Sequence, residues 1–253
     1  MAKAKNPVRS SAKTLRILEA LRELDGARVT ELAEYLDTSK GTVHHHLSTL
    51  REFQYVTKNG DTYELGLHLF ELGEYTRRGT DVYEVAKPEV DELAEEVGEM
   101  ANLMIEDHGM GVYLYIARGE NAVNLDTKIG TRQYLHTSAL GKSILANMPD
   151  EESESVLDEY GLPAETPNTV TDRAELEGEL EAIRDRGVAF DGEERAEGIR
   201  CVAAPITDQR GSLIGAVSVS GPSSRLKGEY FREEVPEMVQ DTATVIGINV
   251  SYS

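Results

Sequence analysis

Residues 30–65 read TELAEYLDTSKGTVHHHLSTLREFQYVTKNGDTYEL, and this stretch decides the fold of the first part of the chain. Residues 30–36 and 40–53 predict two short helices, because apolar side chains recur on one face of each. The polar break between them is short enough for a helix-turn-helix, in which the second helix can enter a DNA major groove.

A hairpin is predicted directly after the second helix. Alternating segments flank Asn59 and Gly60, and an Asn-Gly pair is a strong hairpin signal because both residues tolerate positive φ. Helix, turn, helix and hairpin in this order predict a winged helix-turn-helix domain. We place this DNA-binding domain at 1–66 and a connecting helix at 67–80.

The apolar seam of the second helix defines the opposite, polar face. Val43, Leu47 and Leu50 form the seam, and Ser39 is the expected N-cap of a helix end whose free N–H groups favour phosphate. A winged helix that only docks other proteins is the alternative. The candidate DNA-binding residues on the helix and wing are Ser39, Lys40, Thr42, His44, His45, Ser48, Arg51, Lys58 and Asn59.

The run His44-His45-His46 raises the question of a metal site. Consecutive helical residues point about 100° apart, and helical ligand pairs prefer i, i+4 spacing. We therefore expect no metal and no other cofactor. A metal or redox sensor that uses these histidines and Cys201, the single cysteine, stays open as an alternative.

Composition bounds the class of protein. A chain of 253 residues is long enough for two modest domains, and one cysteine excludes an intrachain disulfide framework. No apolar run approaches the length needed to cross a bilayer, and the N-terminus lacks the apolar core of a signal peptide. We expect a cytoplasmic protein with no membrane partner.

Charge is distributed unevenly along the chain. Residues 1–80 hold 12 Lys and Arg against 11 Asp and Glu, whereas residues 81–253 hold 14 against 35. The formal net charge of −20 therefore lies almost entirely in the second part, away from the expected DNA contacts. This acidity, with no Trp and four Phe, resembles that of halophilic proteins from a high-salt cytoplasm.

The second part predicts an α+β domain at 81–253 around a mostly antiparallel sheet, because strands come in runs with helices outside them. Helices are expected at 81–99, 138–148, 150–160, 172–186 and 229–250, and strands at 101–105, 112–117, 123–127, 188–190, 201–206 and 213–220.

Small polar residues on adjacent predicted strands are candidates to line a cavity. Ser218 and Ser220 share one face of a strand, Cys201 and Ala203 share one face of the preceding strand, and Asp191 ends another. A solvated sheet face is the alternative. We see no nucleophile with an evident base, so we do not expect an enzyme.

The segment 136–143 fails as a nucleotide-binding loop because His136 occupies the position of the first glycine. It still describes a helix N-terminus with small residues and free N–H groups, which suits a carboxylate. An ordinary capped helix is the alternative.

Taken together, the motifs resemble the IclR family of transcriptional regulators over nearly the whole chain. The resemblance rests on the order and spacing of residues 30–33, 41–50, 63–66, 136–142, 198–206 and 218–222.

The resemblance implies a winged helix joined to a GAF-like effector domain that binds small organic acids or aromatics, in a homodimer or a dimer of dimers. An arginine often follows the threonine-valine pair of the recognition helix in this family. Here that residue is His44, which puts base preference in doubt. The effector pocket of the family falls on Ala139, Leu140, Gly141, Asp191, Cys201, Ser218 and Ser220.

These inferences predict a regulator of metabolic genes. A dimer binds a partly palindromic DNA operator, and a small carboxylate from sugar or organic-acid breakdown changes how the two half-sites are held. The rival function is an enzyme or metabolite-binding protein whose winged helix mediates only protein contacts.

Overall fold

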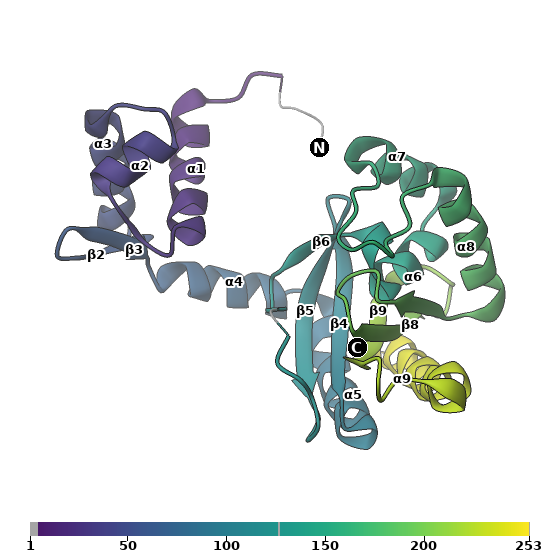
Figure 1. Ribbon diagram of the computed structural model, residues 1–253. Helices are drawn as coiled ribbons and strands as arrows, with labels where there is room; N and C mark the ends of the chain where they lie inside the picture. The colour runs from purple at the N-terminus through teal and green to yellow at the C-terminus, as the bar shows by residue number, and fades with distance from the viewer. Residues whose placement is uncertain (1–4, 126, 253) are drawn as a thin grey trace. The chain divides into compact units, whose positions relative to one another are not determined.

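The computed structural model describes residues 5–125 and 127–252. The chain divides between Gly79 and Thr80 into an N-terminal and a C-terminal compact unit (Figure 1). The connecting helix α4 (His68–Arg78) belongs to the N-terminal unit.

The N-terminal unit is a three-helix core with a small antiparallel sheet. Helices α1 (Arg9–Glu23), α2 (Val29–Tyr35) and α3 (Lys40–Glu52) come first, and strands β2 (Val56–Asn59) and β3 (Thr62–Leu65) form the wing. Strand β1 (Ala27–Arg28) pairs with the other edge of β3, giving the order β1-β3-β2.

One apolar cluster explains why these short elements fold together. The predicted seam of α3, Val43, Leu47 and Leu50, is buried against Leu21 of α1 and Leu32 of α2. Asn59 is the last residue of β2 and pairs with Thr62, so the turn is made by Gly60 and Asp61, one residue later than the predicted Asn59-Gly60 pair. Gly60 has a positive φ of +60°. The helix-turn-helix with its wing is therefore present as predicted.

The C-terminal unit is built on a six-stranded antiparallel sheet in the order β6-β5-β4-β9-β8-β7. Its strands are β4 (Met100–Asp107), β5 (Met110–Arg118), β6 (Arg132–Tyr134), β7 (Ala189–Gly192), β8 (Ile199–Thr207) and β9 (Leu213–Pro222). Its helices are α5 (Asp81–Val97), α6 (Ala139–Asn147), α7 (Asp150–Tyr160), α8 (Arg173–Arg186) and α9 (Val235–Val250), with a π-helical turn at Tyr230–Glu234 before the last.

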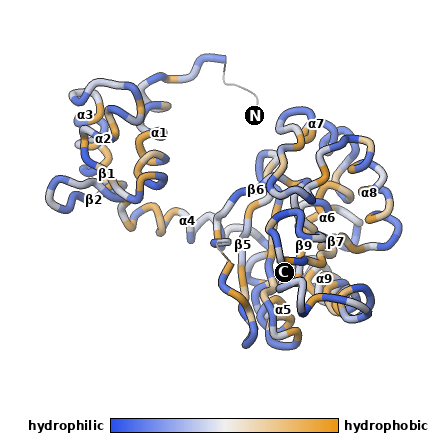
Figure 2. Tube along the Cα trace, in the orientation of Figure 1, coloured by the Kyte–Doolittle hydropathy of each residue, from blue (hydrophilic) through white to orange (hydrophobic). Residues whose placement is uncertain are grey.

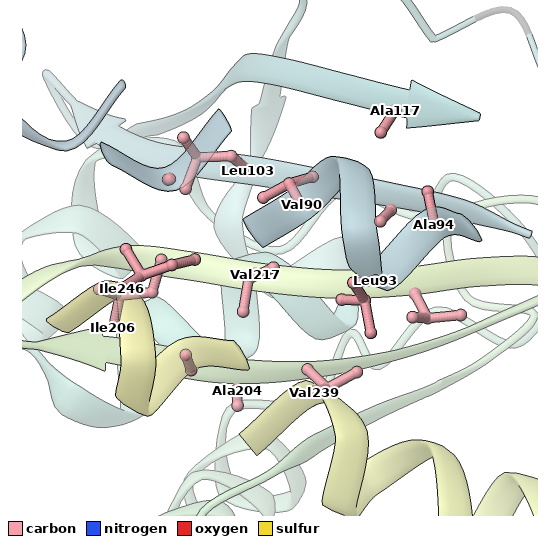
Figure 3. Close-up of a cluster of buried hydrophobic side chains, with 14 of the residues drawn as sticks. Val90, Leu93, Ala94, Leu103, Ala117, Ala204, Ile206, Val217, Val239 and Ile246 are labelled. Carbon is pink, nitrogen blue, oxygen red and sulfur yellow. The ribbon is translucent and has the colours of Figure 1, made fainter. Parts of the chain in front are cut away.

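Helices cover both faces of this sheet. On one face α5 and α9 pack against alternate strand residues such as Leu103, Val217 and Ala204 (Figure 3). On the other face α6 packs against the intervening residues, among them Met104 and Ala203, and α8 packs against α6. Because successive strand residues point to opposite faces, the sheet forms the middle of three layers.

One predicted strand of this sheet is wrong, and one observed strand was not predicted. Residues 123–125 are not in a strand, and Asp126 of the predicted 123–127 strand lies outside the described residues. The edge strand is instead β6, which pairs with β5 through Gln133 and Gly111. Gly119, next to this segment, lies against the backbone of Gly98, and the chain there follows a loop.

Among the described residues, no helix combines the length and the apolar character needed to span a membrane.

Candidate functional site

The N-terminus of α3 is a capped and accessible helix end. Ser39 Oγ accepts the backbone N–H of Thr42 at 3.1 Å, as predicted for the N-cap. Thr42 is half-buried, and its hydroxyl lies 2.8 Å from Ser39 Oγ. This hydroxyl is therefore engaged within the first turn of the helix. Lys40 is exposed beside this helix end.

The polar face of α3 is open to solvent. His44, His45, Ser48 and Arg51 are all exposed, on the side opposite the buried seam. Ser48 Oγ donates to the His44 carbonyl at 2.8 Å, so its proton is used within the helix and its oxygen is left to accept. The face therefore presents two imidazoles and a guanidinium to a partner.

The third histidine of the run has a different environment. His46 is half-buried, and its Nδ1 lies 2.8 Å from Thr14 Oγ1 on α1. Burial lowers the pKa of His46, and the positive charge of Lys13 lowers it further. Across the described residues, no group of three or more His, Cys, Asp or Glu side chains has a metal-ligating arrangement.

The wing residues Lys58 and Asn59 are exposed at the end of β2. The Lys58 ammonium lies 5.4 Å from the ring centroid of Tyr63, which keeps the lysine stem against the hairpin. Both tip residues are free to contact another molecule.

A cavity of about 290 Å³ lies in the C-terminal unit, on the α6 side of the sheet. The register of the strands explains how it forms, because Asp191 is opposite Cys201, Cys201 is opposite Ser220, and Ser220 is opposite Met100. Four adjacent strands thus place one residue each in a row. The cavity is lined by Met100, Asn102, Tyr113, Leu125, Thr127, Ser138, Leu140, Asp191, Arg195, Ala196, Ile199, Cys201 and Ser220.

Four of the predicted effector residues, Leu140, Asp191, Cys201 and Ser220, therefore line one cavity. The other three, Ala139, Gly141 and Ser218, are buried next to the lining without belonging to it.

Gly141 has a structural reason to be glycine. A Cβ at this position would overlap the carbonyl oxygen of Leu135. Its backbone N–H donates to Ser138 Oγ at 3.2 Å, so this amide is not free for a ligand, contrary to the expectation for this helix end.

Asn102 joins the serines of the cavity into a network. Its Nδ2 donates to Ser218 Oγ at 3.2 Å and to Ser220 Oγ at 3.1 Å. Ser220 Oγ in turn donates to Cys201 Sγ at 3.2 Å. Asn102, which was not predicted from the sequence, therefore links the two serines, and Ser220 links them to Cys201.

Gln133 does not line the cavity but connects three residues that do, Tyr113, Ser138 and Arg195. Gln133 Oε1 accepts from Tyr113 Oη at 3.2 Å and from Arg195 Nε at 3.1 Å. Gln133 Nε2 donates to Ser138 Oγ, which also caps α6. Arg195 is half-buried and brings a guanidinium to the cavity wall.

Burial controls the ionisable groups of the cavity. Removal from water raises the pKa of Asp191 to about 7, against the opposing effect of the backbone N–H of Glu194, which donates to Asp191 Oδ1 at 2.6 Å. Burial also raises the pKa of the Cys201 thiol to about 12. A neutral, buried thiol is a poor nucleophile and metal ligand, which disfavours the redox-sensor alternative.

A buried ion pair supports the loop that carries Asp191 and Arg195. Lys142 of α6 is fully buried, and its Nζ donates to Glu194 at 2.6 and 2.8 Å and to Glu179 at 2.7 Å. The pair fixes the loop after β7 to α6 and α8.

These features define a class: a helix-turn-helix transcriptional regulator with a second, cavity-bearing domain. Residues 10–60 match the family model of the IclR helix-turn-helix domain, and residues 75–248 match that of the bacterial transcriptional regulator IclR C-terminal domain. The chain belongs to the IclR family of transcriptional regulators, which are not enzymes.

Relatives cover nearly the full length. The probable HTH-type transcriptional regulator ArcR of Halobacterium salinarum is 34% identical over 247 residues, covering 96% of this chain and 94% of that protein. The IclR crystal structure from Thermotoga maritima has a TM-score of 0.79 at 31% identity, covering 96% of this chain and 99% of that one. An IclR homologue from Microbacterium hydrocarbonoxydans, complexed with 4-hydroxybenzoate, shares the fold with a TM-score of 0.82 at 23% identity, covering 96% and 100%.

Proposed function

We propose that this regulator contacts its operator through α3 and the wing, and that a small organic acid bound in the cavity controls this contact. The exposed polar face of α3 supports the first part, because its buried seam is fully used by the core of the N-terminal unit. The proposed DNA-binding residues are the nine candidates predicted from the sequence: Ser39, Lys40, Thr42, His44, His45, Ser48, Arg51, Lys58 and Asn59.

The observation that carries the effector proposal is that four adjacent strands place polar residues around one cavity, namely Asp191, Cys201, Ser220 and Asn102. A cavity of about 290 Å³ is at the small end of ligand pockets, which span about 300–1,000 Å³, so it suits a small metabolite. Its guanidinium, from Arg195, favours an anionic ligand. The related structure complexed with 4-hydroxybenzoate, a carboxylate, supports the same class. Genes of sugar or organic-acid breakdown are the proposed targets.

We propose further that a second copy of the chain covers α4. No residue of this helix is buried in its own chain, although its trace carries several hydrophobic residues (Figure 2). Phe70 and Tyr75 of α4 are 67% and 81% exposed, and Leu67, the residue before the helix, is 85% exposed. Exposed apolar surface of this kind marks an interface, and a homodimer supplies the two recognition helices that a palindromic operator needs. A dimer of dimers is compatible with the same contact.

Binding to its own upstream DNA tests the operator proposal. Fluorescence anisotropy with a labelled upstream fragment should give saturable binding that an unrelated fragment does not compete away. His45→Ala with Arg51→Ala should weaken specific binding, because both side chains are exposed on the proposed reading face. Equal affinity of this double variant and the parent protein would refute the assignment of that face.

The cavity has its own test. Ser218→Ala with Ser220→Ala removes the two acceptors of Asn102 Nδ2. The effect of an organic acid on the operator affinity of the protein should therefore be lost in this double variant. An unchanged response to the acid in this double variant would refute the cavity assignment.

The dimer is tested by light scattering. Phe70→Glu should yield a monomer with weakened operator affinity, whereas Phe53→Glu, a similarly exposed aromatic outside α4, is the matched control for the oligomeric state. A dimer that persists in Phe70→Glu would refute the role of α4.

A further inference from the structure

A cationic surface lies on α1, outside the nine predicted DNA-binding residues. Arg9, Lys13 and Arg16 are spaced four and three residues apart, so they follow one face of this helix. They border a hollow of about 370 Å³, termed the α1 hollow, which is lined by Pro7, Arg9, Ala12, Lys13, Arg16 and Leu36. Of these six described residues, three are cationic and none is acidic.

The two arginines of the α1 hollow have no internal partner. Within the described part of the chain, neither Arg9 nor Arg16 makes a side-chain hydrogen bond or an ion pair, and both are exposed. By contrast, Arg132, Arg173 and Arg184 of the C-terminal unit lie 2.7, 2.9 and 3.0 Å from a carboxylate. In a chain with 46 Asp and Glu against 26 Lys and Arg, a hollow whose charged residues are all cationic complements an anionic partner.

Lys13 connects the α1 hollow to the end of the recognition helix. Its Nζ donates to Thr38 Oγ1 at 3.0 Å, and Thr38 directly precedes Ser39, the N-cap of α3. Helix α1 also packs against α2 and α3. The α1 hollow therefore lies next to the helix end that is proposed to enter the major groove.

A duplex that receives α3 has a phosphate backbone beside this helix end. The major groove is about 12 Å wide, so the elements next to an inserted helix face one of the two backbones. Contacts to phosphates require positive charge at the right place and carry no sequence information. The apolar side chains of Pro7 and Leu36 give the sugars of this backbone a surface to pack against.

We infer that the α1 hollow binds the DNA phosphate backbone beside the major groove that α3 enters, with Arg9 and Arg16 as the contacts. This inference rests on the operator-binding part of the proposed function, and it adds a surface that the nine candidates do not include. Lys13 is a positioning residue, because it holds Thr38 at the start of α3.

The salt dependence of operator affinity counts the phosphate contacts. Fluorescence anisotropy of the full chain with its labelled upstream fragment is measured over an approximately fourfold range of KCl concentrations within which circular dichroism shows the protein folded. For B-DNA, the slope of log affinity against log salt changes by about 0.9 for each phosphate contact. Arg9→Gln with Arg16→Gln should therefore reduce the slope by about 1.8, so that over this range the parent loses about tenfold more affinity than the double variant.

Arg22→Gln with Arg210→Gln is the matched control. Both arginines are exposed and lie outside the α1 hollow, one in the last turn of α1 and one in the C-terminal unit, so the net charge changes equally. The slope of this control should equal that of the parent. Arg9→Lys with Arg16→Lys should also keep the parent's slope, because a lysine binds phosphate as a point charge.

Unrelated DNA separates the α1 hollow from the reading face of α3. Arg9→Gln with Arg16→Gln should weaken binding to the upstream fragment and to an unrelated fragment by the same factor. His45→Ala with Arg51→Ala should instead lower the ratio between the two affinities, because those side chains are proposed to face the bases.

Each outcome decides a different claim. A parental slope in the Arg9→Gln, Arg16→Gln variant, or an equal reduction in the matched control, overturns this inference and leaves operator binding through α3 standing. A parental slope together with a changed molar mass in light scattering also overturns it, and assigns the α1 hollow to an acidic surface of a second copy. Failure of the parent protein to bind the upstream fragment at any salt concentration overturns both the inference and the operator part of the proposed function.

Discussion

Asp191→Asn should stabilise the C-terminal unit, and the gain should grow with pH. The pKa of Asp191 rises from its ordinary 3.8 to about 7 because the carboxyl is buried on β7. Below about pH 4 the group is neutral in both the folded and the unfolded chain. Between the two pKa values the unfolded chain releases the proton and the folded chain keeps it, so the free energy of unfolding falls as pH rises.

The size of the effect follows from the two pKa values. At about 1.36 kcal/mol per pH unit, the difference between 3.8 and about 7 corresponds to about 4 kcal/mol. Asparagine cannot ionise and still offers an oxygen to the Glu194 N–H. The difference in unfolding free energy between variant and parent should therefore be near zero at about pH 4 and approach about 4 kcal/mol at about pH 8.

Denaturant unfolding at a series of pH values measures this difference. Hydrogen exchange at the amides of β8 and β9 identifies the transition of the C-terminal unit. Asp208→Asn is the matched control, because hydrogen bonds from the Ser212 and Arg210 amides lower the pKa of that exposed carboxyl and reverse the sign. A difference for Asp191→Asn that does not change with pH would refute the reasoning.

Three further predictions concern stability. Gly141→Ala should destabilise the C-terminal unit by about 2 kcal/mol or more, because the new methyl group meets the Leu135 carbonyl; a melting temperature equal to the parent's would contradict this. Lys142→Met should cost about 3 kcal/mol, since Glu194 then lies buried without its cation, and restoration by a second change, Glu194→Leu, is the check in denaturant titrations. Ser39→Ala should cost the N-terminal unit about 1 kcal/mol through loss of the α3 cap, seen as a lower denaturation midpoint.

The fold of the N-terminal unit was predictable because its signals are local. Val43, Leu47 and Leu50 repeat at helical spacing, and the Asn59-Gly60 pair predicts the hairpin to within one residue of its turn, Gly60-Asp61. The edge of the larger sheet was not predictable in the same way. Strand β6 has three residues, too few to show an alternation of apolar and polar side chains. The segment 123–127 was predicted as a strand because it is rich in apolar residues.

The cavity was predictable only in part. Ser218, Ser220 and Cys201 could be placed on shared strand faces by their period of two. Asn102 had the same signal, since it interrupts an apolar strand on the face of Met100 and Met104, and the register to Ser218 shows its place. Arg195 and Gln133 lie in or beside loops and a short edge strand, where no periodicity says which side chains turn inward.

Strand β9 contributes side chains to both faces of the sheet, serines on the cavity side and valines on the side of α5 and α9. Ser218 and Ser220 point to one side, and Val217 and Val219 lie under α5 and α9 on the reverse side. Any shift that an occupant imposes on the serines is therefore also a shift of the valines, with no loop between them to absorb it. Val217 and Val219 pack in the same cluster as α5, and α5 follows the Gly79–Thr80 junction directly in the chain, so β9 joins the cavity to the helix that begins the C-terminal unit.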